Sequence, residues 1–252
     1  MNSIKSRCGV YKTNNCGNLF IIEYVRYNEV RVKFINTGYE TTTTMGQILD
    51  GRVKDRMLPT VCGVGIVGDE PTRVCNKPLK EYDLWQGMLK RCYDNKLHVK
   101  YPTYKGCTVS NNFKYYPYFK EWCQNQIGFE SKDEIGNSFA LDKDILVKGN
   151  KMYSENTCVF IPMEINKLLV KHESRRGGSF IGTYPLRKKF IARLTRCGEN
   201  FYLGVFETEM EAFYAYKEAK EAYIKELANK WKDQIDPRAY DALMDYQIEI
   251  TD

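Results

Sequence analysis

A carboxylate and an amide in one short stretch of the chain are side chains suited to holding a metal ion. The stretch runs from Leu141 to Leu169, with Asp142 at its start and Asn166 near its end. Carboxylate and amide oxygens are ligands that Mg²⁺ prefers in proteins. The sequence therefore predicts a small oxygen-lined site for one Mg²⁺ or Mn²⁺ ion, formed where the chain between these two residues folds back.

The residues around this pair predict a strand, a loop, a second strand and a helix. Leu141-Asp142 is typical of a strand end, and Gly149-Asn150 favours a tight reversal because both residues tolerate positive φ. Thr157 to Ile161 is an apolar run rich in β-branched and aromatic residues, which indicates a strand. Pro162 suits the first turn of a helix. One face of that helix is apolar and is formed by Ile165, Leu168 and Leu169.

This stretch resembles the ββα-metal core of phage HNH and HNN homing-type endonucleases. The residues that carry the resemblance are Asp142, Gly149-Asn150, Glu155-Asn156, Cys158-Val159-Phe160 and Asn166. The resemblance implies that Asp142 and Asn166 hold one divalent metal ion and that Asn156 braces the loop. The chain departs from the family at Lys143, because an active member usually has a histidine base after the aspartate.

The lysine bears directly on catalysis. A general base should titrate near the working pH, whereas the reference pKa of lysine is about 10.4 and falls only through burial or a nearby cation. Asp144 is an alternative proton acceptor, or it orients a water molecule. The candidate catalytic residues are Asp142, Lys143, Asp144, Asn156 and Asn166. The alternative interpretation is that Asp142, Lys143 and Asp144 form a solvated charge cluster at a strand end.

Composition limits the class of protein. The chain has 252 residues, of which 43% are hydrophobic and 28% are charged, and this balance is typical of a globular protein. No run of about 18 apolar residues is present, so no membrane span is expected. The first residues contain no apolar export signal. The nine cysteines are scattered without a C-x-x-C pair, which favours reduced thiols and a cytoplasmic protein.

The chain before the metal-binding stretch predicts two kinds of structure. Residues 1–75 predict a β-rich module with strands at Leu19 to Val25, Val30 to Ile35 and Tyr39 to Thr44. Residues 71–78 predict a linker, and Leu79 to Tyr93 predicts an amphipathic helix. A second helix is predicted from an aromatic stripe whose members we expect to pack in the core: Phe113, Tyr116, Phe119 and Trp122. Both parts resemble segments that precede phage HNH cores.

The C-terminal residues predict three short strands and a long helix. The strands are FIGTY, FIARLTR and NFYLGVF, and Thr208 with Glu211 has the spacing of a capping box at the start of the helix. This segment resembles the plant ethylene-response-factor (apetala-type) DNA-binding domain. The resemblance is carried by Ile181-Gly182, Ala192-Arg193-Leu194, Tyr202-Leu203-Gly204, Phe206 and Thr208. It implies that the three-stranded sheet enters the major groove of double-stranded DNA.

Charge supports this interpretation independently. From Lys171 to Phe206 there are eight basic and two acidic residues, so this segment has an excess of six, which equals the formal net charge of +6 of the whole chain. A localised basic surface is what phosphate contact requires, although a solvated surface without a partner has the same composition. The candidate DNA contacts are Arg175, Arg176, Tyr184, Arg187, Lys188, Lys189, Arg193 and Arg196.

The sequence thus predicts an α+β protein in three parts. They are a β-rich module at 1–75, an HNH-like ββα-metal domain at 79–170 and a DNA-binding sheet-plus-helix domain at 178–252. The first functional hypothesis is an endonuclease that cuts or nicks double-stranded DNA with one Mg²⁺ or Mn²⁺ ion, in the cytoplasm of a phage-infected cell. The second is a degenerate nuclease fold that acts as a DNA-binding regulator or as an inhibitor of another protein.

Overall fold

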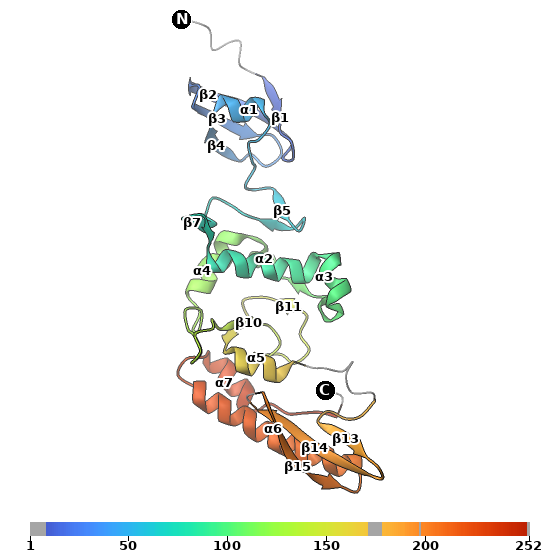
Figure 1. The fold of residues 1–252 in the computed structure, drawn as a ribbon. Helices are drawn as coiled ribbons and strands as arrows, with labels where there is room; N and C mark the ends of the chain where they lie inside the picture. Colours follow the sequence, from blue (N-terminus) through green and yellow to red (C-terminus); the bar gives the residue numbers. More distant parts are fainter. Residues whose placement is uncertain (1–8, 171–177, 197, 251–252) are drawn as a thin grey trace, which may run out of the picture. The chain divides into compact units, whose positions relative to one another are not determined.

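The computed structural model describes residues 9–170, 178–196 and 198–250, and it has the predicted α+β composition. The sequence predicts three parts, whereas contacts between residues group the chain into two compact units, Met1–Glu121 and Trp122–Asp252. Figure 1 labels the helices and strands of both units. We describe each unit by itself.

The first unit begins with a four-stranded antiparallel sheet in the order β1-β2-β3-β4. Its strands are β1 (Val10–Lys12), β2 (Asn18–Arg26), β3 (Glu29–Phe34) and β4 (Glu40–Thr43). Because apolar residues alternate with charged ones in β3, the side chains of Val30, Val32 and Phe34 all face the core. A short helix, α1 (Met45–Leu49), follows and was not predicted; the Thr44 hydroxyl caps it by accepting from the Gln47 amide.

The rest of the first unit combines small hairpins with the predicted helices. The predicted linker at 71–78 contains a hairpin, because its turn residues Cys75 and Asn76 both have positive φ. Phe113, Tyr116 and Phe119 are fully buried, which confirms these members of the aromatic stripe as core packing, and Trp122 is partly buried. The buried indole of Trp85 donates to the Phe113 carbonyl at 2.7 Å. The elements are β5 (Pro59–Val61), β6 (Gly65–Ile66), β7 (Arg73–Val74), β8 (Lys77–Pro78), α2 (Lys80–Tyr93), α3 (Asn95–Lys100), β9 (Thr108–Val109), α4 (Tyr116–Gln124) and two 3-10 turns, Pro102–Tyr104 and Asn112–Lys114.

The second unit contains the predicted strand, loop, strand and helix. β10 (Ala140–Asp142) pairs antiparallel with β12 (Val159–Ile161), and α5 (Met163–Leu169) begins directly after Pro162. The short strand β11 (Met152–Tyr153) lies in the connection between β10 and β12. This order confirms the predicted elements, because β12 is fully buried and carries the apolar run from which it was predicted.

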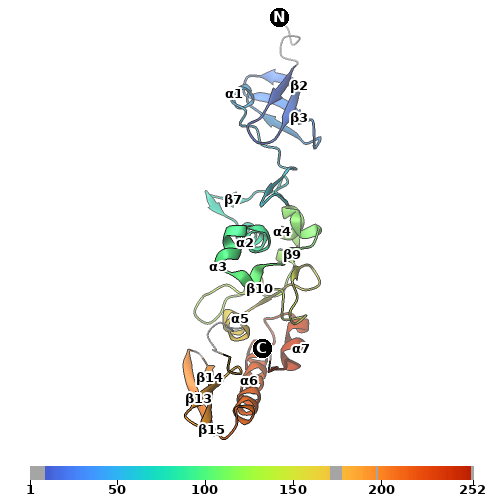
Figure 2. The same ribbon diagram turned by 90° about the vertical axis from the view of Figure 1, so that its right-hand side faces the viewer.

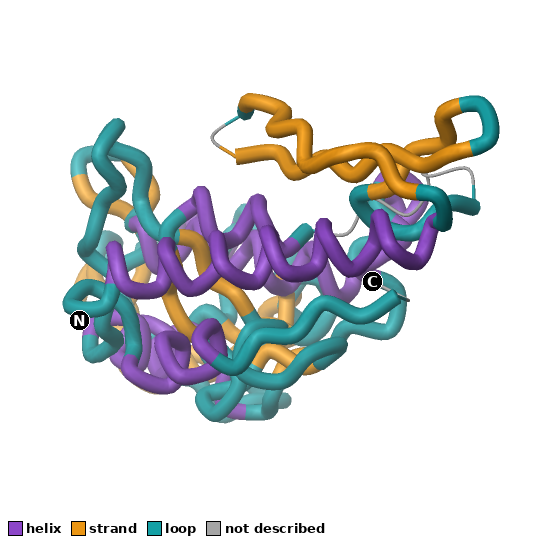
Figure 3. The backbone as a smooth tube through the Cα atoms, turned by 90° about the horizontal axis from the view of Figure 1, so that it is seen from below, coloured by secondary structure: helices purple, strands orange, loops and turns teal. Residues whose placement is uncertain are grey.

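A three-stranded antiparallel sheet and two helices complete the second unit. The elements are β13 (Thr183–Leu186), β14 (Lys189–Arg196), β15 (Glu199–Phe206), α6 (Glu209–Trp231) and α7 (Pro237–Met244). The predicted capping box is present, since the Thr208 and Glu211 side chains each bond the other residue's backbone N–H. In Figures 2 and 3, α6 lies along one face of the sheet.

The helix α6 is shared between this sheet and the β10–β12–α5 element. Near its start it packs on the sheet so closely that a Cβ atom added at Gly182 would lie 2.0 Å from the Tyr216 ring. Further along, the buried Lys220 ammonium donates to the Leu168 carbonyl of α5 at 2.8 Å. At its end, the Trp231 ring contacts Phe139 edge-on at 5.5 Å. One helix therefore joins both substructures within the second unit.

No helix among the described residues is both long enough and apolar enough to cross a bilayer.

Candidate nucleic-acid interface and candidate metal site

Lys143, which stands where the resembling family has its base, is a buried anchor. Its side chain is 7% exposed, and its ammonium donates to the Asn150 carbonyl at 2.7 Å and to the Asp144 carboxylate. The same ammonium lies 5.6 Å from the centre of the Tyr153 ring. These three contacts hold the core loop, which we define as residues 143–151, against β11.

Asp142 ends β10 and turns the chain into the core loop. One of its carboxylate oxygens accepts hydrogen bonds from the amides of Asp144 and Ile145, each at 2.8 Å. Burial raises the pKa of the Asp142 carboxyl above its usual value, against the lowering effect of these two bonds. Its second carboxylate oxygen accepts no hydrogen bond from the described residues, so one oxygen is available to a ligand.

Asn166 lies in α5 beside the buried Ile165, and its amide side chain makes no hydrogen bond within the described part of the chain. Asn156 lies in an exposed turn, and its side chain likewise has no such bond. The bracing of the loop expected of Asn156 is done by Asn150 instead, because the Asn150 amide donates to the carbonyls of Lys143 and Met152, both at 2.7 Å.

Asp142 and Asn166 carry the kind of donor atom that a hard cation takes. Asp142 and Asn166 supply oxygen atoms, which is the chemistry of Mg²⁺ held through one carboxylate, water and phosphate. Among the described residues, no group of three or more His, Cys, Asp or Glu side chains is placed to bind a metal.

The chain has two histidines. His98 lies in α3 of the first unit, and its Nε2 atom is 2.8 Å from the Arg91 carbonyl oxygen. The helix forms because the Asp94 side chain caps it by accepting from the Lys96 amide. His172 lies outside the described residues.

The sheet β13-β14-β15 presents one open face. Residues that pair directly across antiparallel strands share a face, and the register pairs Tyr184 with Ile191 and Ile191 with Val205. The next row on the same face pairs Arg193 with Tyr202. No described element of Trp122–Asp252 covers this face in Figure 3, and Tyr202 is 61% exposed. We call these five residues the open face.

The basic residues predicted to contact DNA divide into four groups, of which three are described first. Arg193 is exposed on the open face, and its guanidinium lies over the Tyr184 ring at 5.7 Å. Arg187 and Lys188 are exposed in the turn between β13 and β14, which we call the basic turn. None of these three residues has a carboxylate partner among the described residues. Arg175 and Arg176 lie outside the described residues.

Two other predicted contacts are engaged within the protein. The Lys189 ammonium forms an ion pair with Glu207 at 2.5 Å. Arg196 lies on the opposite side of the sheet from Arg193, where it pairs with Glu226 of α6 and stacks over the Tyr223 ring at 4.3 Å. The period of two along a strand explains the difference between the two arginines, because their positions differ by three, an odd number.

Sequence reasoning missed the apolar part of the open face. Ile191, Tyr202 and Val205 were not predicted as contacts, although Tyr202 and Val205 are well exposed. The signal was present in the strand alternation, which places these residues on the same side as Arg193. The predicted contacts were basic residues and Tyr184, so the prediction left out the apolar side chains of this face.

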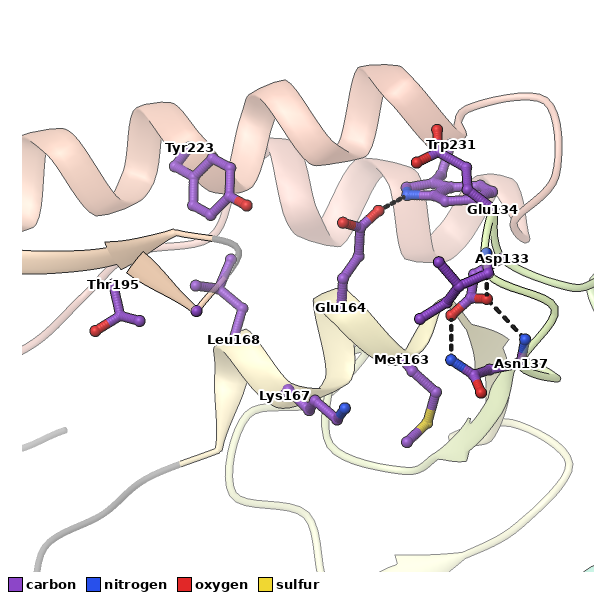
Figure 4. Close-up of a pocket in the computed structure, with 12 residues that line it drawn as sticks. Asp133, Glu134, Asn137, Met163, Glu164, Lys167, Leu168, Thr195, Tyr223 and Trp231 are labelled. Atoms are coloured by element: carbon purple, nitrogen blue, oxygen red, sulfur yellow. Dashed lines mark hydrogen bonds between the residues drawn. The ribbon is translucent and has the colours of Figure 1, made fainter. Parts of the chain in front are cut away.

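A cavity of about 630 Å³ lies between α5, α6 and the 133–137 turn. Figure 4 shows the Glu164 carboxylate accepting from the Trp231 indole, and Asp133 held by Asn137. Glu164 also accepts from the Lys230 ammonium at 3.0 Å. The Glu164 carboxylate thus links α5 to the end of α6.

Comparison of the chain with protein-family models, with curated proteins and with solved structures finds no match.

Proposed function

We propose that the chain binds double-stranded DNA through the open face of the β13-β14-β15 sheet. The observation that carries the proposal is Arg193, which is exposed on an uncovered sheet face, stacked on Tyr184 and without a carboxylate partner among the described residues. The major groove admits β-strands, and an arginine there can bond both acceptors of a guanine.

The distribution of ion pairs assigns different tasks to the basic residues. Arg187 and Lys188, in the basic turn at one end of the sheet, are suited to phosphate contact, which fixes position without reading sequence. Lys189 and Arg196 already neutralise Glu207 and Glu226. Arg193 is therefore the basic side chain of the sheet best placed to reach a base edge.

The test compares two arginines of the same strand in the full chain. Arg193→Ala should weaken binding to a selected duplex by about 1–3 kcal/mol, or roughly 5- to 150-fold, and relax its sequence preference. Arg196→Ala is the matched control, because its side chain faces α6 and should affect stability rather than affinity. Affinity is measured by fluorescence anisotropy. Equal losses of affinity in both variants would show that Arg193, on the open face, contributes no more to DNA binding than Arg196 on the opposite face.

Salt dependence tests the phosphate contacts separately. Contacts from Arg187, Lys188 and one further cation correspond to a slope of about −3 in log affinity against log salt, or roughly a 40-fold loss between 50 and 200 mM. Lys188→Ala should reduce this slope by about 1 for every duplex sequence. Lys132→Ala removes an exposed lysine outside the sheet and should leave the slope unchanged. No binding of any duplex at low salt would refute the proposal.

A second candidate function is cleavage of the bound DNA, and the observation that favours it is the pair of available oxygens on Asp142 and Asn166. A Mg²⁺ or Mn²⁺ ion bound there would polarise a phosphodiester and stabilise the leaving oxygen. The task of the protein residues is to hold that charge beside the DNA. Lys143 is tied to Asn150 and Asp144, so Asp144 or a water molecule remains as the proton acceptor.

Plasmid nicking tests the second candidate. Asp142→Ala should abolish any nicking and leave duplex binding nearly intact, whereas Asp83→Ala, which removes an exposed carboxylate of α2, should change neither. Nicking that persists in pure Asp142→Ala protein would place the active site elsewhere. Binding without nicking in either metal would instead favour a degenerate core that regulates DNA or inhibits another protein.

A further inference from the structure

The open face has an apolar row that the basic residues do not explain. Tyr184, Ile191 and Val205 lie side by side across the three strands; Tyr184 is 51% and Val205 40% exposed, whereas Ile191 between them is 9% exposed and supports the two outer side chains. Leu186, also exposed, pairs with Lys189 one row further along the same face. A row of this kind on a surface beside a basic turn needs a partner that is both anionic and locally apolar.

Duplex DNA has one such apolar group in the major groove, the C5-methyl group of thymine. We propose that the row Tyr184–Ile191–Val205 reads thymine methyl groups within about two base pairs of the base that Arg193 contacts. The inference rests on the proposed DNA binding and names the part of the DNA that the face recognises. It assigns sequence specificity to three uncharged residues, of which only Tyr184 has a side chain that can form a hydrogen bond.

The geometry favours a methyl group over another apolar partner. Arg193 and Tyr202 form the next row of the face, so a guanidinium and an apolar surface lie in adjacent rows. Adjacent rows of one face lie two residues apart along a strand, about 6.7 Å, and stacked base pairs are separated by about 3.4 Å, so adjacent rows reach base pairs about two steps apart. The guanidinium and the basic turn make this surface complementary to a polyanion rather than to an apolar protein face.

The experiment removes only the methyl groups. A duplex is first enriched from a random-sequence pool by the full chain and is then remade with every thymine replaced by uracil, which lacks the C5-methyl group. Each methyl group that the row buries should contribute about fourfold in affinity, equivalent to about 0.8 kcal/mol. The uracil duplex should therefore bind at least about fourfold more weakly than the thymine duplex at the same salt concentration.

A variant pair assigns the effect to the row. Val205→Thr keeps the size and the β-branched shape of the side chain but replaces a methyl group with a hydroxyl, so the sheet should fold normally. It should reduce the difference between the thymine and uracil duplexes while leaving binding of the uracil duplex close to that of the unmodified chain. Val25→Thr, at an exposed position of β2, is the matched control and should keep the full difference.

The outcomes separate this inference from the proposed function. If no duplex binds, the proposed DNA binding fails and the inference falls with it. If duplexes bind but none is enriched, if the enriched duplex contains no thymine, or if uracil binds as well as thymine, DNA binding stands and methyl reading is overturned. A thymine preference that is undiminished in Val205→Thr also overturns the assignment to this row.

Discussion

Replacing Lys143 with methionine should loosen the core loop without unfolding the protein. Methionine keeps the length and the apolar stem of the side chain but removes the donor that holds the Asn150 carbonyl at 2.7 Å. A hydrogen bond from a charged group contributes about 1.5–3 kcal/mol. The contact with Asp144 adds little, because the Asp144 side chain is 52% exposed and such ion pairs are screened.

A loss of this size corresponds to an increase of roughly 10- to 150-fold in the population of the opened loop. The assay is hydrogen exchange of the full chain, followed by mass spectrometry of a peptide that covers residues 143–153. The amides of Asp144 and Ile145, which bond to Asp142, and that of Asn150, which bonds to Val147, lie within it. Their exchange should accelerate by that factor in the Lys143→Met variant.

Desolvation of the Lys143 ammonium opposes the stabilisation by its contacts, because the free-energy penalty of burying a charge can equal the free energy that its contacts contribute. Three partners surround this ammonium, so we expect the contacts to prevail. Lys143→Arg keeps a donor and should exchange at an intermediate rate, and Lys132→Met changes an exposed lysine and should have no effect. Unchanged or slower exchange in Lys143→Met would refute the anchoring role and return Lys143 to consideration as a catalytic group.

Three further predictions concern stability and reactivity. The hydrogen bond from the Arg238 guanidinium holds the pKa of Asp236 below its usual value, so its stabilisation is complete above the unfolded pKa near 3.9 and is lost as the pH falls through the lower folded pKa. Asp236→Ala should therefore lower the free energy of unfolding by about 1 kcal/mol at neutral pH and by less near pH 3, as measured by urea titration. Gly182→Ala should lower the melting temperature far more than Gly149→Ala. Both glycines have positive φ, but only at Gly182 would the added Cβ atom collide with a ring, that of Tyr216 at 2.0 Å. Similar shifts in melting temperature would contradict the close packing. Burial raises the pKa of the Cys158 thiol to about 12, so iodoacetamide should leave this residue unmodified in the native chain and alkylate it after denaturation, and native alkylation detected by peptide mass spectrometry would count against the buried assignment.

The elements with strong periodicity could be predicted from the sequence. The alternation of Val30, Val32 and Phe34 gives β3, and the burial of Trp85 follows from its place in an amphipathic stripe. The short elements could not be predicted in the same way. The helix α3, which contains His98, spans six residues and owes its start to one capping side chain, so its periodic signal is too brief to separate from a loop.

The roles of residues that depend on tertiary contacts could not be predicted from the sequence either. The charge of Lys143 is visible in the chain, but its burial against Tyr153 and Asn150 depends on how the core loop closes. Strand alternation could have separated Arg193 from Arg196, because their positions have opposite parity. The partner of Arg196, Glu226, lies 30 residues away and is visible only in the folded chain.

The shared helix α6 bears on how such a protein can change over evolutionary time. A boundary drawn between residues 170 and 178 would separate Lys220 from the Leu168 carbonyl and Trp231 from Phe139. Recombination at that boundary would leave a buried ammonium without its acceptor and an indole exposed to water, so an exchanged sheet would arrive unstable. The sheet and the β10–β12–α5 element are therefore expected to be inherited together, and new specificities to arise by substitution on the open face rather than by exchange of the whole sheet.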